Sequence, residues 1–589
     1  MESPLVRRTL EFLDAATAAL PGGGEHRPGQ RRMAAAVAET IEGDGHLVVQ
    51  AGTGTGKSLA YLCAAAASGR RTVVATATRA LQDQLAGKDL PFLADVLPVP
   101  LSFAVLKGRS NYLCLQRLDE LAAAGAGESR LDLGLGDATV EPEILDAVGE
   151  AAAISETGER AELGVDLDDA TWRLVSVTAD ECPGASRCPR GDECLAEAAR
   201  RRAAEVDILV VNLHLFALDV ALGGGVVLPE ADLVVVDEAH QLEDIAAAAT
   251  GRSVSPGRLR AVARRVRALV AGSTAATRLD AAADRLAATV SALVGERLGS
   301  NRDDELEGPL TAARAAVAAA VEEIRSLPAG APADLVTRAR RARSMCDALL
   351  VDIDAVAAPT DDEVRWVDGP ERNPALTVTP VEVGALLADK LWSDHPAVCT
   401  SATIPPSFVT RVGLPATTVE LDVGSPFDHE GNALLYCAAH LPDPRRPDAD
   451  EARWAELEEL IVAAGGRTLA LFTSFAAMNR ATDHLTGRLP WTVLRQGDAA
   501  KATLLEAFNA DETACLFATL SFWQGVDVPG RSCILVVIDR LPFPRPDEPV
   551  LMARRERAGS AAFRAVDLPR AATLLAQGAG RLLRRADDR

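Results

Sequence analysis

Residues 51–58 read AGTGTGKS, a run that could bind the phosphates of a nucleotide. Glycines let backbone N–H groups turn around a phosphate, Lys57 supplies a positive charge, and the Ser58 hydroxyl can ligate Mg²⁺. The strict pattern begins with glycine, whereas this sequence has Ala51. The predicted nucleotide-binding residues of this loop are Gly52, Thr53, Gly54, Thr55, Gly56, Lys57 and Ser58.

The second chemical motif is ADLVVVDEAHQLED, residues 231–244. Its apolar run predicts a buried strand that delivers Asp237 and Glu238 at its carboxyl end, where open α/β sheets bind ligands. Asp237 could hold Mg²⁺, and Glu238 could orient and deprotonate a water molecule. We add His240 of the same motif to the nucleotide-binding residues. Together with the glycine loop, this motif predicts a nucleoside triphosphatase.

A late helix offers a third group of reactive side chains. In LLAQGAGRLLRR, a continuous helix would place Gln577, Arg581 and Arg584 on one face. Arginines that reach a γ-phosphate stabilise charge in the transition state, so we predict Arg581 and Arg584 to be catalytic and Gln577 to bind nucleotide. The alternative is a solvent-exposed basic stripe. Gly578 and Gly580 weaken a helix and therefore indicate close backbone approach.

Three cysteines, Cys182, Cys188 and Cys194, follow one another at an even spacing in DECPGASRCPRGDEC. Three thiols are too few for a complete four-ligand site, and iron–sulfur and zinc sites are equally compatible with these residues alone. The remaining cysteines occupy apolar runs or stand alone. We interpret them as core or spare thiols: Cys63, Cys346, Cys399, Cys437, Cys515 and Cys533.

The bulk properties limit the class of protein. A chain of 589 residues has room for about three to five domains. It lacks a long uncharged apolar run, and its first residues predict an amphipathic helix, so we expect a cytoplasmic protein without a membrane segment. Its cysteines should then be mostly reduced. The net charge of −23 argues only mildly against nucleic-acid binding, because local basic patches can exist on an acidic chain.

These motifs sit at the ends of apolar strands, and helical patterns follow several of them. VVATATRALQDQL, AVCTSATI, TLALFTSF and CLFATLSFWQGVDVPG repeat this arrangement. It predicts an α/β fold with parallel sheets. Residues 246–375 differ, because their composition and periodicity predict helices.

In order and spacing, these stretches resemble the superfamily-two helicases, and within them the DinG/XPD-like iron–sulfur group. The resemblance also covers EHRPGQRRMA, LKGRSNYLC, SPFDHEGNALLY, RLPFPRPDEPV and QGAGRLLRR. It implies two RecA-like parallel-sheet motor domains with an iron–sulfur insertion and a helical arch insertion. The implied boundaries are 1–106, 206–245 and 376–425 for motor domain 1, 107–205 for the iron–sulfur domain, 246–375 for the arch, and 426–589 for motor domain 2.

The resemblance also implies site residues. Cys114 would join Cys182, Cys188 and Cys194 as ligands of a [4Fe–4S] cluster, with zinc as the less favoured alternative. Gln30 would read adenine. Strand-end residues would contact the DNA backbone: Thr76, Thr78 and Arg79 in the first motor domain, and Thr473 and Ser474 in the second.

The resemblance thus implies a monomeric, ATP- and Mg²⁺-dependent DNA helicase that moves 5′ to 3′ on single-stranded DNA. Its substrates would be duplex, forked or RNA–DNA hybrid structures in repair or replication. Two alternatives stay open: a DEAH-type RNA helicase, and a DNA-binding redox sensor with a vestigial ATPase. Gln524 stands where relatives often have Glu. The end at Arg589, directly after the arginine-rich helix, leads us to expect a truncated second domain.

Overall fold

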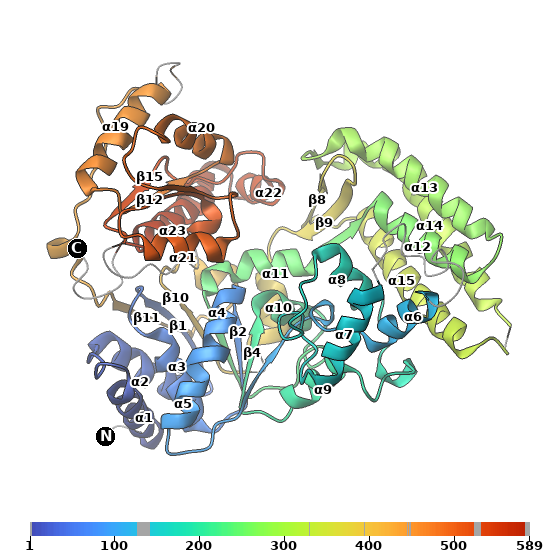
Figure 1. Ribbon diagram of the computed structural model, residues 1–589, viewed down its shortest axis with the longest axis horizontal. Helices are drawn as coiled ribbons and strands as arrows, with labels where there is room; N and C mark the ends of the chain where they lie inside the picture. Colours follow the sequence, from blue (N-terminus) through green and yellow to red (C-terminus); the bar gives the residue numbers. More distant parts are fainter. Residues whose placement is uncertain are drawn as a thin grey trace.

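A computed structural model describes residues 3–125, 142–328, 330–393, 395–443, 446, 449–523 and 532–582 of the chain. Figure 1 shows a blue body at the amino terminus, an orange and red body above it, and a green bundle of helices to the right. The two bodies on the left each contain a parallel sheet. The predicted α/β fold with parallel sheets is therefore confirmed.

The first sheet has the strand order β11-β1-β10-β5-β2-β4-β3, and each neighbouring pair is parallel. Its strands are β1 (His46–Ala51), β2 (Thr72–Thr76), β3 (Phe103–Leu106), β4 (Ile208–Asn212), β5 (Leu233–Asp237), β10 (Ala397–Ser401) and β11 (Val419–Gly424). Because the strands are parallel, the carboxyl ends of β1, β5 and β10 lie along one edge. The glycine loop, the acidic motif and TSAT are thereby brought together.

Helices cover both faces of this sheet. Alternate residues of β1, for example Leu47 and Val48, belong to cores on opposite faces. One face packs against α1 (Pro4–Ala19), α2 (Pro28–Glu42), α3 (Lys57–Ser68) and α5 (Leu90–Val96), and the other against α10 (Leu213–Ala221) and α11 (Leu242–Thr250). Short helices complete this body: α4 (Arg79–Gln84), α16 (Gly384–Leu387), α17 (Phe408–Arg411) and α18 (His429–Asn432).

The cysteine-bearing segment leaves the sheet after β3 and returns at β4, which is its neighbour. It contains α6 (Leu115–Gly125), α7 (Pro142–Ile154), α8 (Asp169–Val175) and α9 (Leu195–Ala203). A separate small core, which includes Leu113, Val148 and Trp172, holds these helices together. Both ends of the segment are anchored on adjacent strands.

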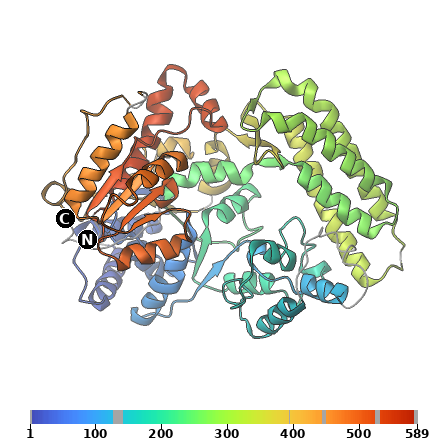
Figure 2. The ribbon, with the colours of Figure 1, turned by 45° about the horizontal axis from the view of Figure 1, so that its top comes forward.

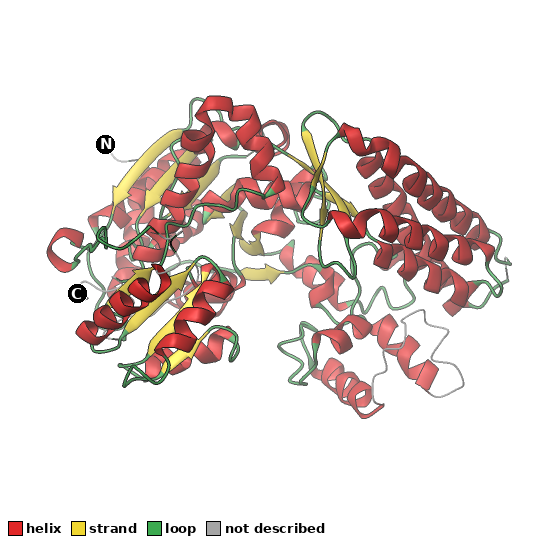
Figure 3. Cartoon of the chain, turned by 90° about the horizontal axis from the view of Figure 1, so that it is seen from above, coloured by secondary structure: helices red, strands yellow, loops and turns green. Residues whose placement is uncertain are grey.

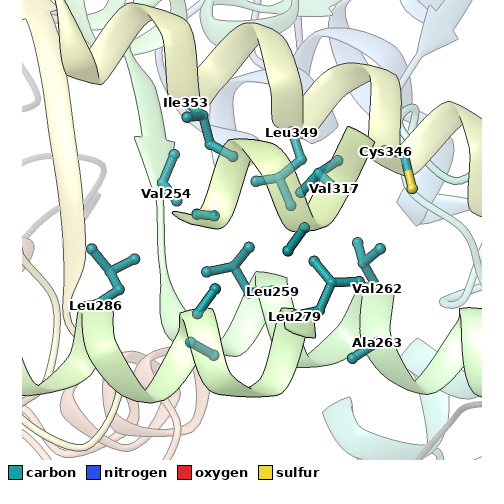
Figure 4. Packing of buried hydrophobic residues seen from close by; sticks show 14 of the residues in the cluster. Val254, Leu259, Val262, Ala263, Leu279, Leu286, Val317, Cys346, Leu349 and Ile353 are labelled. Carbon is teal, nitrogen blue, oxygen red and sulfur yellow. The ribbon is translucent and has the colours of Figure 1, made fainter. Parts of the chain in front are cut away.

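The second long excursion forms an antiparallel helical bundle. Its helices are α12 (Pro256–Leu269), α13 (Thr274–Val290), α14 (Asp303–Arg325) and α15 (Ala333–Ala357). Figure 4 shows their apolar side chains meeting in one core, with Leu259, Leu279, Val317 and Leu349 pointing inward. Figure 2 shows this bundle beside the teal cysteine-bearing segment.

The sequence did not predict the antiparallel sheet at the base of this bundle. Its order is β6-β9-β8-β7, with β6 (Arg252–Val254), β7 (Arg297–Leu298), β8 (Glu363–Asp368) and β9 (Ala375–Pro380). Two of these strands have only three and two residues, too few to produce a recognisable alternation. Pairing of β6 with β9 brings the two ends of the bundle segment together.

The second parallel sheet has the order β13-β14-β12-β15. Its strands are β12 (Thr468–Phe472), β13 (Val493–Arg495), β14 (Cys515–Thr519) and β15 (Leu535–Ile538). Its helices are α19 (Ala449–Ala464), α20 (Phe475–Leu485), α21 (Lys501–Ala510), α22 (Pro549–Ala558) and α23 (Leu568–Ala579). Figure 3 shows both yellow parallel sheets flanked by red helices. No helix in the described part of the chain is both long and apolar enough to span a bilayer.

Candidate functional site

The glycine loop connects β1 to α3 as predicted. Gly54 and Gly56 have φ values of +79° and +82°, which glycine adopts without strain. A Cβ on Gly56 would lie 2.2 Å from Nε2 of Gln30, so no other residue fits here. Gln30 is buried, and its Nε2 donates to the Gly56 carbonyl at 3.0 Å. Gln30 lies within α2 and supports the loop directly in this structure.

The carboxylates of the acidic motif lie at the end of β5, next to Lys57. Lys57 Nζ donates to Glu238 Oε1 at 3.0 Å and lies 3.9 Å from Asp237 Oδ1. Burial alone would raise the pKa of Glu238, but the positive charge of Lys57 and the hydrogen bond with His240 hold it well below its usual range. Glu238 also has φ +54°, a strained backbone conformation typical of functional sites.

A chain of hydrogen bonds runs from Glu238 to the second parallel-sheet body. Ser401 Oγ, at the end of β10, donates to Glu238 Oε2 at 3.1 Å and lies 2.8 Å from His240 Nδ1. On the other side of the ring, His240 Nε2 lies 2.8 Å from Nε2 of Gln577 on α23. These contacts connect the first sheet to α23 at the site itself.

The glycine loop, the acidic motif and the carboxyl end of α23 meet at one cavity of about 350 Å³. Its walls include the whole glycine loop, Asp237, Glu238, His240, Gln577 and Arg581. A Cβ on Gly578 would lie 3.1 Å from the Trp523 ring, which is tighter than an ordinary contact, so the prediction of close backbone approach is confirmed there. A Cβ on Gly580, the cap of α23, would lie 3.5 Å from Oγ1 of Thr53, an ordinary van der Waals distance.

The prediction of a continuous helix through residue 584 was wrong at Arg581. α23 ends at Ala579 with Gly580 as its cap, and Arg581 follows the helix. The Nε of Arg581 donates to the Gln577 carbonyl at 3.0 Å, which keeps both residues on the cavity wall. Arg584 and Gln524 lie outside the described residues.

The residues predicted to contact DNA differ in accessibility. Thr76 is fully buried, and its hydroxyl points to the Thr78 carbonyl at 3.4 Å, so its side chain is not available to a strand. Thr78 caps α4, whereas Arg79 is exposed. At the end of β12, Thr473 is half-buried and Ser474 is exposed as the cap of α20. Arg79 also borders a cavity of about 770 Å³ that Lys107, Asn111 and Arg173 line.

The four predicted cysteine ligands come together. Cys114, Cys182, Cys188 and Cys194 line one small cavity of about 30 Å³, and all four thiols are free of disulfides. Cys114 comes directly before α6, and Cys194 caps α9. In the described part of the chain, no three or more His, Cys, Asp or Glu side chains are grouped so that they could hold a metal ion.

A cluster of arginines with mostly buried side chains lies beside this cavity. Arg341 of α15 reaches it and donates to Glu120 at 2.7 Å, and Arg117 and Arg265 pair with Glu181. Burial and repulsion from Arg117 lower the pKa of Arg265 to about 9. Within the described residues, Nε and Nη1 of Arg117 and Nε of Arg341 find no hydrogen-bond acceptor. Three guanidiniums thus face two carboxylates beside the cysteines.

Three residues that line or support the nucleotide cavity were missed from the sequence. The Tyr61 hydroxyl donates to Asp237 Oδ2 at 3.0 Å, Arg27 donates to the Gly54 carbonyl, and the Phe427 ring packs against Gly54. Tyr61 lies one helical turn beyond Lys57 in α3, a spacing that could have indicated it. Phe427 is far away in the sequence, and no local pattern connects it to the loop.

Two family profiles match the chain. The DEAD/DEAH box helicase profile matches residues 27–121, and the helicase C-terminal domain profile matches residues 457–589. Among named proteins, the chain is 42% identical to the ATP-dependent helicase DinG of Mycobacterium tuberculosis, over 98% of this chain and 91% of that protein. It is 36% identical to the ATP-dependent DNA helicase YoaA of Escherichia coli, over 97% and 91%.

Solved structures agree on the fold. A structure titled XPD helicase superposes with a TM-score of 0.57 at 14% identity, over 96% of this chain and 94% of that one. The S. tokodaii protein Xpd4 superposes with a TM-score of 0.55 at 14% identity, over 95% and 94%. Both similarities extend over both parallel sheets and the two insertions.

Proposed function

We propose site roles on the basis that the chain belongs to the family of ATP-dependent DNA helicases that includes DinG and YoaA. The protein is an ATP-dependent DNA helicase. ATP binds in the cavity between the two parallel-sheet bodies, with its phosphates on the glycine loop. The N–H groups at the start of α3 and the Lys57 ammonium group would bind the β- and γ-phosphates.

Ser58 and Asp237 would hold Mg²⁺. Oxygen ligands suit this ion, and Asp237 is a buried carboxylate whose position is fixed by Tyr61. When bound, Mg²⁺ neutralises charge on the phosphates. Glu238 is ionised and its carboxylate lines the cavity, so it would orient and deprotonate the attacking water; a phosphate that draws Lys57 away from it would remove the contact that lowers its pKa.

One observation carries this proposal: the hydrogen-bonded chain Glu238–Ser401–His240–Gln577 links the hydrolytic carboxylate to α23 of the second body. Arg581 follows α23 and borders the same cavity, where a guanidinium would stabilise transition-state charge. A change at the γ-phosphate is therefore passed to the second body through direct contacts. Such coupling is what a translocating ATPase requires.

Single-stranded DNA would lie across the carboxyl ends of β2 and β12. Thr78, Arg79, Thr473 and Ser474 are the candidates for backbone contact, because hydroxyl and cationic groups there would bind phosphates without reading bases. Movement from 5′ to 3′, forked or hybrid substrates, and a monomeric state stay predictions from the family resemblance.

The four cysteines would hold a [4Fe–4S] cluster. The fit rests on two observations: all four thiols line one cavity, and buried guanidinium N–H groups beside them have no acceptor. A cluster with four thiolate ligands is anionic and would provide the missing negative charge. It would also cross-link the ends of the cysteine-bearing segment.

The test of the ATPase is Lys57→Ala. We expect loss of DNA-stimulated ATP hydrolysis and of unwinding, because the phosphate loses its cationic partner. Lys88→Ala removes an exposed lysine outside the site and should behave as wild type. DNA-stimulated turnover by Lys57→Ala at the wild-type rate would overturn the proposed site.

The test of the cluster is metal analysis after purification without oxygen. We expect about four irons and four sulfides per chain, lost in Cys188→Ser and retained in Cys437→Ser, whose thiol is exposed and distant from the cavity. One zinc and no sulfide would replace the cluster by a zinc site and leave the ATPase assignment intact.

A further inference from the structure

Two carboxylates just beyond the acidic motif face the second body instead of the nucleotide. Glu243 and Asp244 lie in the first turn of α11, three and four residues after His240. Neither lines the nucleotide cavity. The mechanism above assigns them no role, yet they form the densest ionic contact between the two parallel-sheet bodies.

Asp244 is bound by two arginines of the second body. Arg570, in the first turn of α23, donates Nη1 to Oδ2 at 2.5 Å and Nη2 to Oδ1 at 2.7 Å. Arg554 of α22 donates to Oδ1 at 2.7 Å, and its Nη2 lies 3.1 Å from Glu243. The Asp244 side chain is 48% exposed, so desolvation opposes its ionisation only in part, and the bonds from Arg570 and Arg554 hold its pKa well below the usual range. The contact is therefore fully charged at neutral pH.

Arg554 extends the contact to the base of the helical bundle. Its side chain is only 5% exposed, and its Nε donates to the carbonyl of Val381, directly after β9, at 2.8 Å. Arg411 of the first body pairs with Glu243 from the other side. Two-point guanidinium–carboxylate contacts fix orientation as well as distance.

α23 is consequently held against the first body at two points. Arg570 binds Asp244 near its amino end, and Gln577 contacts His240 near its carboxyl end. Seven residues separate them, which is about 10 Å along a helix. If the contact between Arg570 and Asp244 were lost, α23 could tilt about its carboxyl end, and the positions of Gln577 and Arg581 relative to the nucleotide would no longer be fixed at two points.

We propose that Asp244, bound by Arg570 and Arg554, is the interdomain joint that positions α23 for ATP hydrolysis. Asp244 is a positioning residue, because it touches neither the nucleotide cavity nor the predicted DNA surface. The inference rests on the proposed function, since it assigns the joint to the same ATPase site. The joint should affect ATP hydrolysis and not ATP binding, because it positions Arg581, whereas the glycine loop binds ATP without help from the joint.

The experiment compares Asp244→Asn, Arg570→Gln and the double variant in steady-state ATPase assays at saturating single-stranded DNA. We expect kcat to fall about 10- to 100-fold in each single variant, with KM for ATP and Kd for DNA within about twofold of wild type. The double variant should lose no more than Asp244→Asn alone, because Asp244→Asn already disturbs the contact that Arg570→Gln removes, whereas Arg570→Gln leaves the bond from Arg554 to Asp244 in place.

A matched control is the exposed two-point pair between Arg314 and Asp354 within the helical bundle. Arg314→Gln and Asp354→Asn should leave kcat unchanged. Arg570→Lys keeps the charge but loses the second bond, so an intermediate kcat is expected. Thermal unfolding of every variant shows whether a substitution has prevented folding. If the other variants do not fold, the kcat of Arg570→Lys tests the proposal, since wild-type kcat in this variant would overturn it.

The results separate the two proposals. An active wild type with an equally active Asp244→Asn variant overturns the joint and leaves the ATPase site standing. Additive losses in the double variant also overturn it, because the two residues would then act independently. A wild type without DNA-stimulated hydrolysis overturns the proposed function and this inference together.

Discussion

Glu238 and Lys57 form an ion pair that a bound phosphate must disturb, and this gives a two-sided prediction for Glu238→Gln. Lys57 Nζ lies 3.0 Å from Glu238 and 3.9 Å from Asp237, and both partner side chains are mostly buried. The amide of Gln keeps the shape of the side chain but removes its charge. ATP should then bind more tightly, although hydrolysis should nearly stop.

The magnitude follows from the two distances. Coulomb attraction varies inversely with distance, so Glu238 provides a little more than half of the attraction on Lys57, and Asp237 keeps the remainder. A hydrogen bond from Lys57 to a charged phosphate would contribute about 1.5 to 3 kcal/mol. If removal of the Glu238 charge makes about half of this energy available, ATP should bind about 4- to 12-fold more tightly. Loss of a general base should lower kcat by about 10²- to 10⁴-fold.

The assay is equilibrium titration with a fluorescent ATP analogue at pH 6 and pH 9. Because the pKa of Glu238 is lowered, the wild-type pair is charged at both pH values and would be lost only in strong acid. The tightening should therefore be equal at both. In a Lys57→Ala background, Glu238→Gln should have no effect on affinity. Unchanged or weaker binding by the single variant would refute the idea that the pair competes with phosphate.

Two further predictions concern packing. Gly56→Ala should weaken ATP binding at least tenfold, because the new Cβ would lie 2.2 Å from Nε2 of Gln30. Gly69 has a similar φ but no atom near its Cβ position, so Gly69→Ala should bind ATP normally. Equal ATP affinities of the two variants in a titration would contradict this. Arg341→Leu should destabilise the protein by about 3 to 5 kcal/mol, because Glu120 would lose its closest partner in a nearly dry site. Thermal unfolding measures this loss of stability. As the control, Arg343→Leu breaks an exposed pair with Asp347 and should lower the free energy of unfolding by less than about 1 kcal/mol. Equal losses of stability in the two variants would refute the burial argument.

Local motifs were predictable because their geometry is set within a few residues. The glycine loop needs positive φ at Gly54 and Gly56 and a helix start at Lys57, and all of these can be read from residues 51–58. The acidic motif likewise follows a strand of five buried residues. Family resemblance added Cys114, which no spacing rule connects to the other three cysteines.

Contacts between distant elements were not predictable from the single sequence. Asp244 and Arg570 lie 326 positions apart, and Glu120 and Arg341 lie 221 apart. An amphipathic helix pattern alone does not place the arginines of α12 and α15, yet Arg341 is buried, and Arg265, with a side chain 12% exposed, pairs with Glu181. An arginine on an amphipathic pattern has the same sequence signature in both environments, and tertiary packing alone distinguishes them.

Two ionic contacts connect the domains of this acidic chain: Asp244 with Arg570 and Arg554, which we call the first joint, and Glu120 with Arg341 together with Glu181 and Arg265, which we call the second. Exposed phosphate contacts are screened by salt, whereas buried pairs are screened much less. Both side chains of the Arg341–Glu120 pair are at most 5% exposed, so this pair is shielded from ions, whereas Arg554 is 5% exposed but its partner Asp244 is 48% exposed. Each joint also adjoins a functional residue in the sequence, Glu181 beside Cys182 and Asp244 four positions after His240. Domain position and site geometry therefore depend on the same side chains.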